Sequence, residues 1–205
     1  MYKPLILLAT AVVLVTAQET ELRAVAKIAE PRGENVQGNV TFTQLADCKV
    51  HVEGTILGMI HGKYGFHVHE KGDITGGCGS TGGHFNPENK QHGHPDDENR
   101  HVGDLGNIEF DENRIGRIDY IDSKLSLTGP HSIIGRAVVL HEKADDFGRS
   151  DHPDSKKTGN AGGRVACGVI GILNPVNGWN INSAAKSSII TAILFPIATV
   201  FFLIH

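Results

Sequence analysis

The chain has 205 residues, of which 40% are hydrophobic and 20% are charged, enough for one domain with a sizeable core. Its net charge of −4 gives no indication of binding to nucleic acid or to an acidic membrane surface. The chain is rich in glycine and histidine, with 25 and 12 residues, and its three cysteines leave one unpaired if a single disulfide forms.

Residues 1–17 are predicted to be a cleaved signal peptide. Lys3 precedes an apolar run from Leu5 to Val15, and small residues follow at a cleavage site that would leave Gln18 as the first residue. The alternative is a retained membrane anchor, but the apolar run is short for a membrane span. Secretion would permit a disulfide.

The middle of the chain, from Arg23 to Ile172, is predicted to be an all-β domain. It lacks a long helical periodicity and instead has short alternating runs bounded by Gly, Asn and Asp, which are typical of a sandwich or barrel. The expected strands cover residues 40–45, 50–57, 66–69, 115–121, 133–140 and 165–172. Asn39 begins a glycosylation sequon, which matters if the chain is secreted. Cys48 lies in or near a strand and is predicted to be a buried apolar residue.

Two long polar stretches, residues 71–104 and 142–163, interrupt this pattern, and loops of such length are usually functional or disordered. His67 and His69 immediately precede the first stretch, and their spacing on a strand places both rings on one face. His141 ends another expected strand. The first loop then adds four more candidate ligands: His84, His92, His101 and Asp104.

These residue types suit two transition metals. Imidazole binds both copper and zinc, and a carboxylate can complete a tetrahedral zinc site. If the four loop residues fill a zinc site, then His67, His69 and His141 remain, one ligand short of a copper site with four histidines. A shared imidazolate would supply the missing ligand, because its two nitrogens can each hold a metal.

Two motifs resemble the signatures of copper/zinc superoxide dismutases: GFHVHE at residues 65–70 and GNAGGRVACG at residues 159–168. The segments at 82–87, 100–107 and 141–146 are also similar to the family. The resemblance implies an eight-stranded Greek-key β-barrel or sandwich with a long zinc loop and a long electrostatic loop. It also implies an enzyme of extracellular antioxidant defence, with one copper and one zinc ion per subunit. Such an enzyme converts superoxide to oxygen and hydrogen peroxide by one-electron cycling of the copper.

Carried over position by position, the resemblance implies a role for each site residue. The implied copper ligands are His67, His69, His84 and His141. The implied zinc ligands are His84, His92, His101 and Asp104, so that His84 bridges the two metals. Asp145 would link His67 and His92 by hydrogen bonds, and Cys78 would form a disulfide with Cys167. The implied catalytic residues are Arg164, which would hold the anion, and His84, which would accept and return a proton.

Charged residues elsewhere would affect the attraction of the substrate and the association with a second subunit. Lys143, Lys156 and Lys157 could steer the superoxide anion, since steering raises association rates by ~10 to 10³. The position of Lys71 lies near an apolar dimer contact in related enzymes, so the sequence predicts a homodimer that Lys71 weakens. The other six histidines, His51, His61, His94, His131, His152 and His205, receive no role.

The C-terminus carries a polar linker at residues 176–188 and an apolar tail at 189–205, after a domain spanning 18–175. Small residues from Asn182 to Ala185 precede the tail, and no Lys or Arg follows it. This order favours a glycolipid (GPI) anchor signal, although the spacer is short. One alternative is a tail that is retained in the membrane. The other is a tail that is neither retained in the membrane nor exchanged for a glycolipid anchor.

Three rival functions are disfavoured by the same residues. A non-catalytic metal binder at the cell surface should lack a copper ligand or Arg164, and this chain lacks neither. A copper chaperone should carry an added metal-delivery domain or a C-x-C tail. A zinc hydrolase needs an open zinc position, whereas four side chains fill the predicted one.

Overall fold

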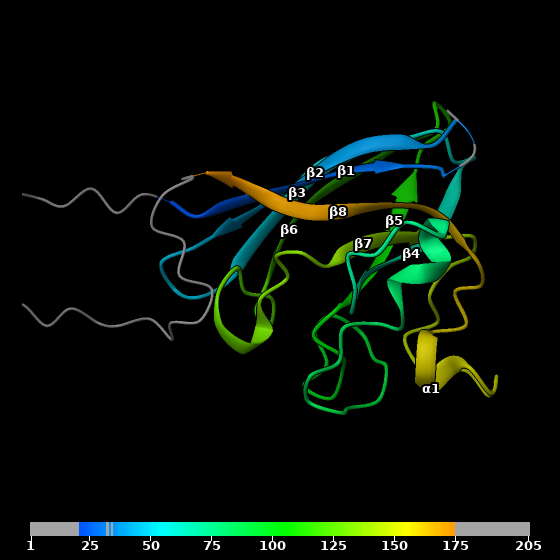
Figure 1. Ribbon diagram of the computed structural model, residues 1–205. Coiled ribbons are helices and arrows are strands. Elements are labelled where there is room, and N and C mark those ends of the chain that lie inside the picture. The colour runs from blue at the N-terminus through cyan, green and yellow to red at the C-terminus, as the bar shows by residue number, and fades with distance from the viewer. Residues whose placement is uncertain (1–20, 32, 34, 175–205) are drawn as a thin grey trace, which may run out of the picture.

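The computed structural model describes residues 21–31, 33 and 35–174, which form a closed antiparallel barrel of eight strands (Figure 1). Around the barrel the strands follow the order β1-β2-β3-β6-β5-β4-β7-β8, a Greek-key arrangement that confirms the predicted fold class. The strands are β1 (Arg23–Ala29), β2 (Gln37–Gln44), β3 (Val50–Leu57), β4 (Gly62–His69), β5 (Asp104–Phe110), β6 (Ile115–Asp122), β7 (Ala137–His141) and β8 (Arg164–Asn174).

Alternating apolar residues fill the barrel interior, as expected for strands with one buried face. In β1, for example, Ala24, Ala26 and Ile28 are completely buried while Lys27 is exposed. The largest fully buried apolar side chains of the described residues are Phe42, Phe66, Phe110, Ile28, Ile56, Leu125, Leu127, Ile133, Leu140 and Ile170. This core gives the strands that carry the candidate ligands a rigid base.

Strand β4 changes neighbour along its length, and this change positions two of the predicted ligands. Gly62 to Gly65 pair with β5 and Phe66 to His69 pair with β7, while His67 also pairs with Asp104 of β5 after a register shift. All residues from Tyr64 to His69 are buried, so side chains on both faces of this half of the strand are covered. His67 and His69 consequently lie inside the molecule.

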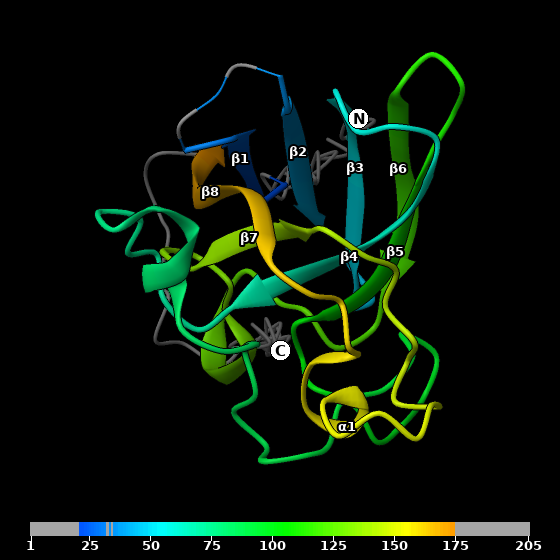
Figure 2. The same cartoon turned by 90° about the vertical axis from the view of Figure 1, so that its right-hand side faces the viewer.

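The two long polar stretches form loops at the same end of the barrel (Figure 2). The first connects β4 to β5 and contains the 3₁₀ helix η1 (Gly77–Thr81), and the second connects β7 to β8 and contains the single turn α1 (Ser155–Thr158). A second 3₁₀ helix, η2 (Gly129–His131), lies between β6 and β7. The amide of His92 in the first loop donates to the carbonyl of Lys156 in the second, at 3.0 Å, so the loops are in direct contact.

Most expected strands are present, with shifted ends. Strand β3 covers the predicted residues 50–57, but β7 begins at Ala137 rather than at 133. Ile133 is buried in a turn, where its amide donates to the carbonyl of Ser126, so its apolar character reflects core packing and not a strand. Strands β1 and β5 were not among the expected strands.

The prediction that Cys48 is buried is wrong. Cys48 is exposed in the turn between β2 and β3, where its amide donates to the carbonyl of Leu45. Its φ of 66° belongs to the left-handed region typical of turns, so the chain reverses there instead of continuing a strand. Asn39 lies exposed on β2.

The predicted signal peptide and C-terminal tail fall on residues 1–17 and 176–205, outside the described residues. Within the part of the chain that the structure describes, no helix is long and apolar enough to cross a membrane.

Candidate metal centre

Seven buried side chains gather at the loop end of the barrel in two sets of potential metal ligands. His84 belongs to both sets. The first contains His67, His69, His84 and His141, and the second contains His84, His92, His101 and Asp104. Within each set the ligand atoms lie within 4.8 Å of one another. The structure thus brings together all seven side chains that the sequence singled out as metal ligands.

In the first set, backbone carbonyls determine which nitrogen of His69 and His141 is free. Nδ1 of His69 lies 2.8 Å from the carbonyl oxygen of Gly82, and Nδ1 of His141 lies 3.2 Å from that of Gly162. A carbonyl oxygen can only accept, so each Nδ1 carries a proton and each Nε2 presents a lone pair. The two Nε2 atoms nevertheless lie only 3.3 Å apart. Two lone pairs facing each other are stabilised by a cation between them.

The other two members of this set also present free nitrogens. His67 donates from Nε2 to Oδ2 of Asp145 at 2.9 Å, which leaves its Nδ1 without a hydrogen-bond partner among the described residues. Nε2 of His84 is buried without such a partner as well. Burying an unpaired polar atom is costly, so these nitrogens are suited to bind a cation. Four imidazole nitrogens suit copper.

The second set surrounds a single carboxylate oxygen. Oδ1 of Asp104 lies 2.9 Å from Nδ1 of His84, 3.0 Å from Nδ1 of His92 and 3.1 Å from Nδ1 of His101. A tetrahedral zinc site with ligand bonds of about 2.0 Å has edges of about 3.3 Å, close to these distances. Oδ2 of Asp104 accepts the amides of His101 at 2.8 Å and Gly93 at 3.1 Å, which fixes the carboxylate. The donor set therefore fits zinc.

Asp145 connects the two sets through its two carboxylate oxygens. Oδ1 accepts from Nε2 of His92 at 2.7 Å, and Oδ2 accepts from Nε2 of His67. Asn107 holds the Asp145 backbone, donating to its carbonyl at 2.9 Å and accepting its amide at 2.7 Å. Because Asp145 takes the Nε2 protons, both rings turn Nδ1 toward the metal positions, the orientation that such supporting carboxylates provide.

Burial keeps the first set neutral. Desolvation lowers the pKa of His67 and His69, and the neighbouring imidazole of His84 lowers both further. Burial also lowers the pKa of His84, against the opposing hydrogen bond to Asp104, and it lowers that of His141 to about 4. Neutral imidazole is the form that binds metals.

The second set has the opposite electrostatics, because it contains a carboxylate and lies beside another. Burial disfavours the ionised form of Asp104, but hydrogen bonds from His101, His84 and His92 outweigh it and lower the pKa of Asp104. Burial likewise opposes a charge on His92, yet Asp104 and Asp145 raise its pKa to about 9. The side chains around His92 thus favour positive charge at this position.

Arg164, at the start of β8, carries a positive charge beside the first set. Its charge contributes to lowering the pKa of both His69 and His141. In the described part of the chain, every hydrogen bond of its guanidinium goes to a neutral group within residues 78–82. The acceptors are the carbonyls of Cys78 at 2.8 Å, Gly79 at 3.0 Å and Gly82 at 2.6 Å, and Oγ1 of Thr81 at 3.0 Å. No carboxylate pairs with Arg164 among the described residues, so its charge is available to an anion.

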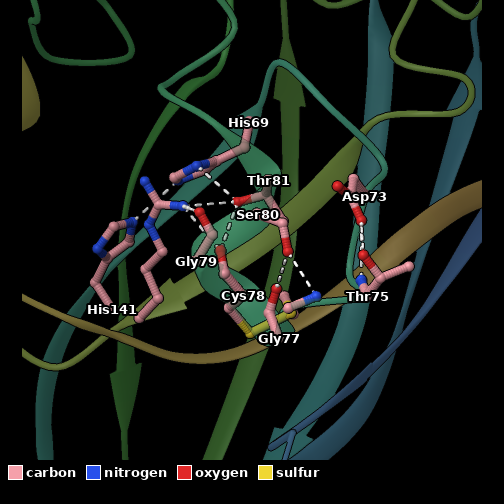
Figure 3. Close-up of a disulfide and its surroundings, with 12 residues drawn as sticks. His69, Asp73, Thr75, Gly77, Cys78, Gly79, Ser80, Thr81 and His141 are labelled. Atoms are coloured by element: carbon pink, nitrogen blue, oxygen red, sulfur yellow. Dashed lines mark hydrogen bonds between the residues drawn. A yellow bond between two sulfur atoms is a disulfide. The ribbon is translucent and has the colours of Figure 1, made fainter.

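A disulfide between Cys78 of η1 and Cys167 of β8 holds these acceptors near Arg164 (Figure 3). The two Cα atoms are 5.7 Å apart, and the cysteines are 89 positions apart in the sequence. Closing a loop of this length stabilises the fold by about 4–5 kcal/mol in the chain-entropy estimate. Cys167 also lies on the same strand as Arg164, so the bond ties the loop directly to the strand that presents the guanidinium.

Gly82 shows why the loop needs a glycine at this point. Its φ of 77° lies in the left-handed region, and a Cβ there would lie 2.2 Å from Oε1 of Glu70. In this conformation its carbonyl accepts from both His69 and Arg164. The candidate copper ligand and the arginine therefore share one backbone acceptor.

The histidines without a predicted role lie outside both sets in the described part of the chain. Each approaches a carboxylate instead: His51 with Asp119, His61 with Glu112, His94 with Asp96, His131 with Glu88 and His152 with Asp154. His205 lies beyond the described residues. Sequence reasoning missed Thr81 and Asn107 as contributors to the site. Asn107 ends one of the recognised motifs, whereas no pattern in the sequence indicates Thr81.

Comparisons with known proteins agree with this geometry. The profile of the family described as "Copper/zinc superoxide dismutase (SODC)" matches residues 36–170. The extracellular superoxide dismutase [Cu-Zn] of Drosophila melanogaster is 59% identical over 139 residues, which cover 67% of this chain and 76% of the relative. A crystal structure of the clock protein EA4 has a TM-score of 0.72 and 67% identity, and the match covers 78% of this chain and 100% of that one.

Proposed function

The chain belongs to the copper/zinc superoxide dismutase family, and from this premise we propose which of its residues convert superoxide to oxygen and hydrogen peroxide. The protein is an extracellular oxidoreductase that uses copper and zinc. We assign copper to His67, His69, His84 and His141, and zinc to His84, His92, His101 and Asp104. The convergence of buried ring nitrogens without other partners carries this assignment, and the metal content of single-ligand variants tests it.

Bound copper supplies one-electron redox chemistry, which zinc lacks. Of the described residues, His84 alone belongs to both sets, and it faces Asp104 through Nδ1 and the first set through Nε2. Nε2 is therefore the atom at which His84 can hold a proton and return it to the reduced product. Dismutation consumes two protons for each pair of superoxide anions, so a proton held at this atom acts where product forms.

Arg164 attracts the superoxide anion and orients it beside the first set. Its guanidinium is always charged, and its planar donors are held in one orientation by the loop at residues 78–82. Lys143, Lys156 and Lys157 are exposed on the second long loop and steer the anion from solution.

Residues 189–205 are proposed to direct attachment of a glycolipid anchor near Asn182–Ala185, after removal of residues 1–17. Treating cells that express the full chain with a phosphatidylinositol-specific phospholipase C is expected to release the enzyme into the medium. A variant ending at Asn182 is the control, because it should be secreted without treatment. Enzyme that stays on treated cells would contradict the anchor.

Glycosylation of exposed Asn39 is proposed as well, and an unchanged mass after glycosidase treatment would exclude it.

A weak homodimer is also proposed. Ile74 and Val169 are 44% and 38% exposed, and a Cβ at Gly72 would lie 3.2 Å from Cγ1 of Val169, so an exposed apolar side chain lies close to the residue that follows Lys71. Burying the charged Lys71 in a contact is unfavourable. Sedimentation at micromolar concentration is therefore expected to show a monomer–dimer equilibrium that Lys71→Leu shifts toward dimer. A stable dimer with Lys71 in place would contradict this expectation.

A further inference from the structure

The hydroxyl of Thr81 lies between the candidate copper site and the disulfide, at the end of η1 (Figure 3). Thr81 is completely buried. Its Oγ1 is 3.0 Å from Nη1 of Arg164, 3.1 Å from Nδ1 of His69 and 2.8 Å from the carbonyl oxygen of Cys78. One side chain thus touches the arginine, a candidate ligand and the disulfide-bonded turn.

The directions of these three hydrogen bonds follow from the partners. The Cys78 carbonyl can only accept, so the single hydroxyl proton of Thr81 goes to it. Arg164 and the Nδ1–H of His69 can only donate, so Oγ1 accepts from both. Both donors are shared: the Nδ1 proton also faces the Gly82 carbonyl at 2.8 Å, and the two protons of Nη1 face three acceptors. All hydrogen-bonding capacity of the hydroxyl is used, and this fixes its orientation.

Thr81 differs from the other groups that hold Arg164. In the described residues the other acceptors of the guanidinium are backbone carbonyls of Cys78, Gly79 and Gly82, whereas Thr81 provides a side chain. It is also an acceptor that Arg164 shares with His69, besides the Gly82 carbonyl. Because Arg164 and His69 both contact this hydroxyl, Thr81 restricts the distance between the guanidinium and the ring of His69.

We propose that Thr81 is a positioning residue. It holds the guanidinium of Arg164 at a defined position relative to the ring of His69 and thereby sets the affinity of the enzyme for its anionic substrate. The inference rests on the proposed role of Arg164 in binding the anion. Thr81 belongs to neither candidate ligand set and acts through the guanidinium and the imidazole. Its loss leaves Arg164 charged and still held by carbonyls, so the expected defect is a misplaced guanidinium and not a missing one.

Azide binding to the copper(II) form of the full holoenzyme tests the proposal, because azide is a small anion whose binding changes the visible spectrum. Thr81→Val removes the hydroxyl at nearly constant volume and is expected to weaken azide binding about three- to tenfold at equal metal content, the size of effect of losing one ordinary hydrogen bond, here the one that Arg164 donates to Oγ1. Thr81→Ser keeps the hydroxyl and is expected to restore the affinity. Thr81→Ala serves the same test if the valine variant does not fold.

Ser80→Ala is the matched control in the same turn. The hydroxyl of Ser80 accepts from the amide of Gly76 at 2.9 Å and donates to the carbonyl of Gly77 at 3.1 Å, without contacting Arg164 (Figure 3). Its loss is expected to leave azide affinity unchanged. Equal weakening in Ser80→Ala and Thr81→Val would show that any damage to the turn suffices and would overturn the proposal.

The proposal and the role of Arg164 can fail separately. Normal azide affinity in Thr81→Val, together with weakened affinity in Arg164→Ala, would remove Thr81 from positioning and leave Arg164 in place. Normal affinity in both variants would remove Arg164 as well. Lower thermal stability of Thr81→Val with unchanged azide affinity would also overturn the proposal, because it would show a purely structural hydroxyl.

Discussion

Replacing His141 by Ala is expected to reduce superoxide dismutation to background and to deplete copper while zinc is retained. His141 belongs to the first ligand set only, and its free Nε2 lies 3.3 Å from that of His69. Loss of a supporting residue already weakens metal affinity by about 10–100-fold, and loss of a ligand should weaken it at least as much. Mass spectrometry of bound metals, combined with the dismutation rate, measures both effects.

The converse variant tests the second set. Asp104→Ala removes the oxygen around which three Nδ1 atoms gather, so it is expected to deplete zinc. His131→Ala is the matched control, because this histidine lies outside both sets and pairs with Glu88.

Retention of full copper and full activity by His141→Ala would contradict the assignment of the copper site, and so would equal loss of copper in His131→Ala.

Arg164→Ala is expected to keep both metals and to lower the second-order rate constant by about 10- to 10³-fold, the range that electrostatic attraction of a charged substrate can supply. The guanidinium contacts neutral acceptors only, so its removal exposes no unpaired carboxylate among the described residues and should leave the metal sites intact. The rate should also depend less on ionic strength, because salt screens the lost attraction. Pulse radiolysis at several salt concentrations measures both quantities.

Two further variants separate charge from geometry at this position. Arg164→Lys keeps the charge but loses the planar fork that fits the loop carbonyls, so an intermediate rate is expected. Arg117→Ala is the control, since Arg117 is exposed on β6 and pairs with Asp111. An unchanged rate in Arg164→Ala would remove this residue from anion binding, and an equal drop in Arg117→Ala would indicate a general effect of net charge.

The sequence by itself determined the fold class and the chemical character of the site. The alternating run at 50–57 became β3 at the same residues, because one buried face imposes a period of two wherever a strand lines a core. His67 and His69 share a strand, and the segments between the two motifs supply ligands of the types that copper and zinc require. These features are local, and residue type and spacing are sufficient to predict them.

The tertiary structure alone decided which ring nitrogen of each histidine is free to bind a metal and which side chains hold Arg164. The free nitrogen of His67 is Nδ1 because Asp145, 78 residues away, takes the proton of Nε2, and the free nitrogen of His141 is Nε2 because Gly162 provides a carbonyl. Thr81 enters the site because the disulfide-bonded turn brings its hydroxyl to Arg164, 83 residues away. Hydrogen bonds depend on positions in space, so partners this distant in sequence leave no local pattern, and only the family resemblance led us to expect the bond between Asp145 and His67.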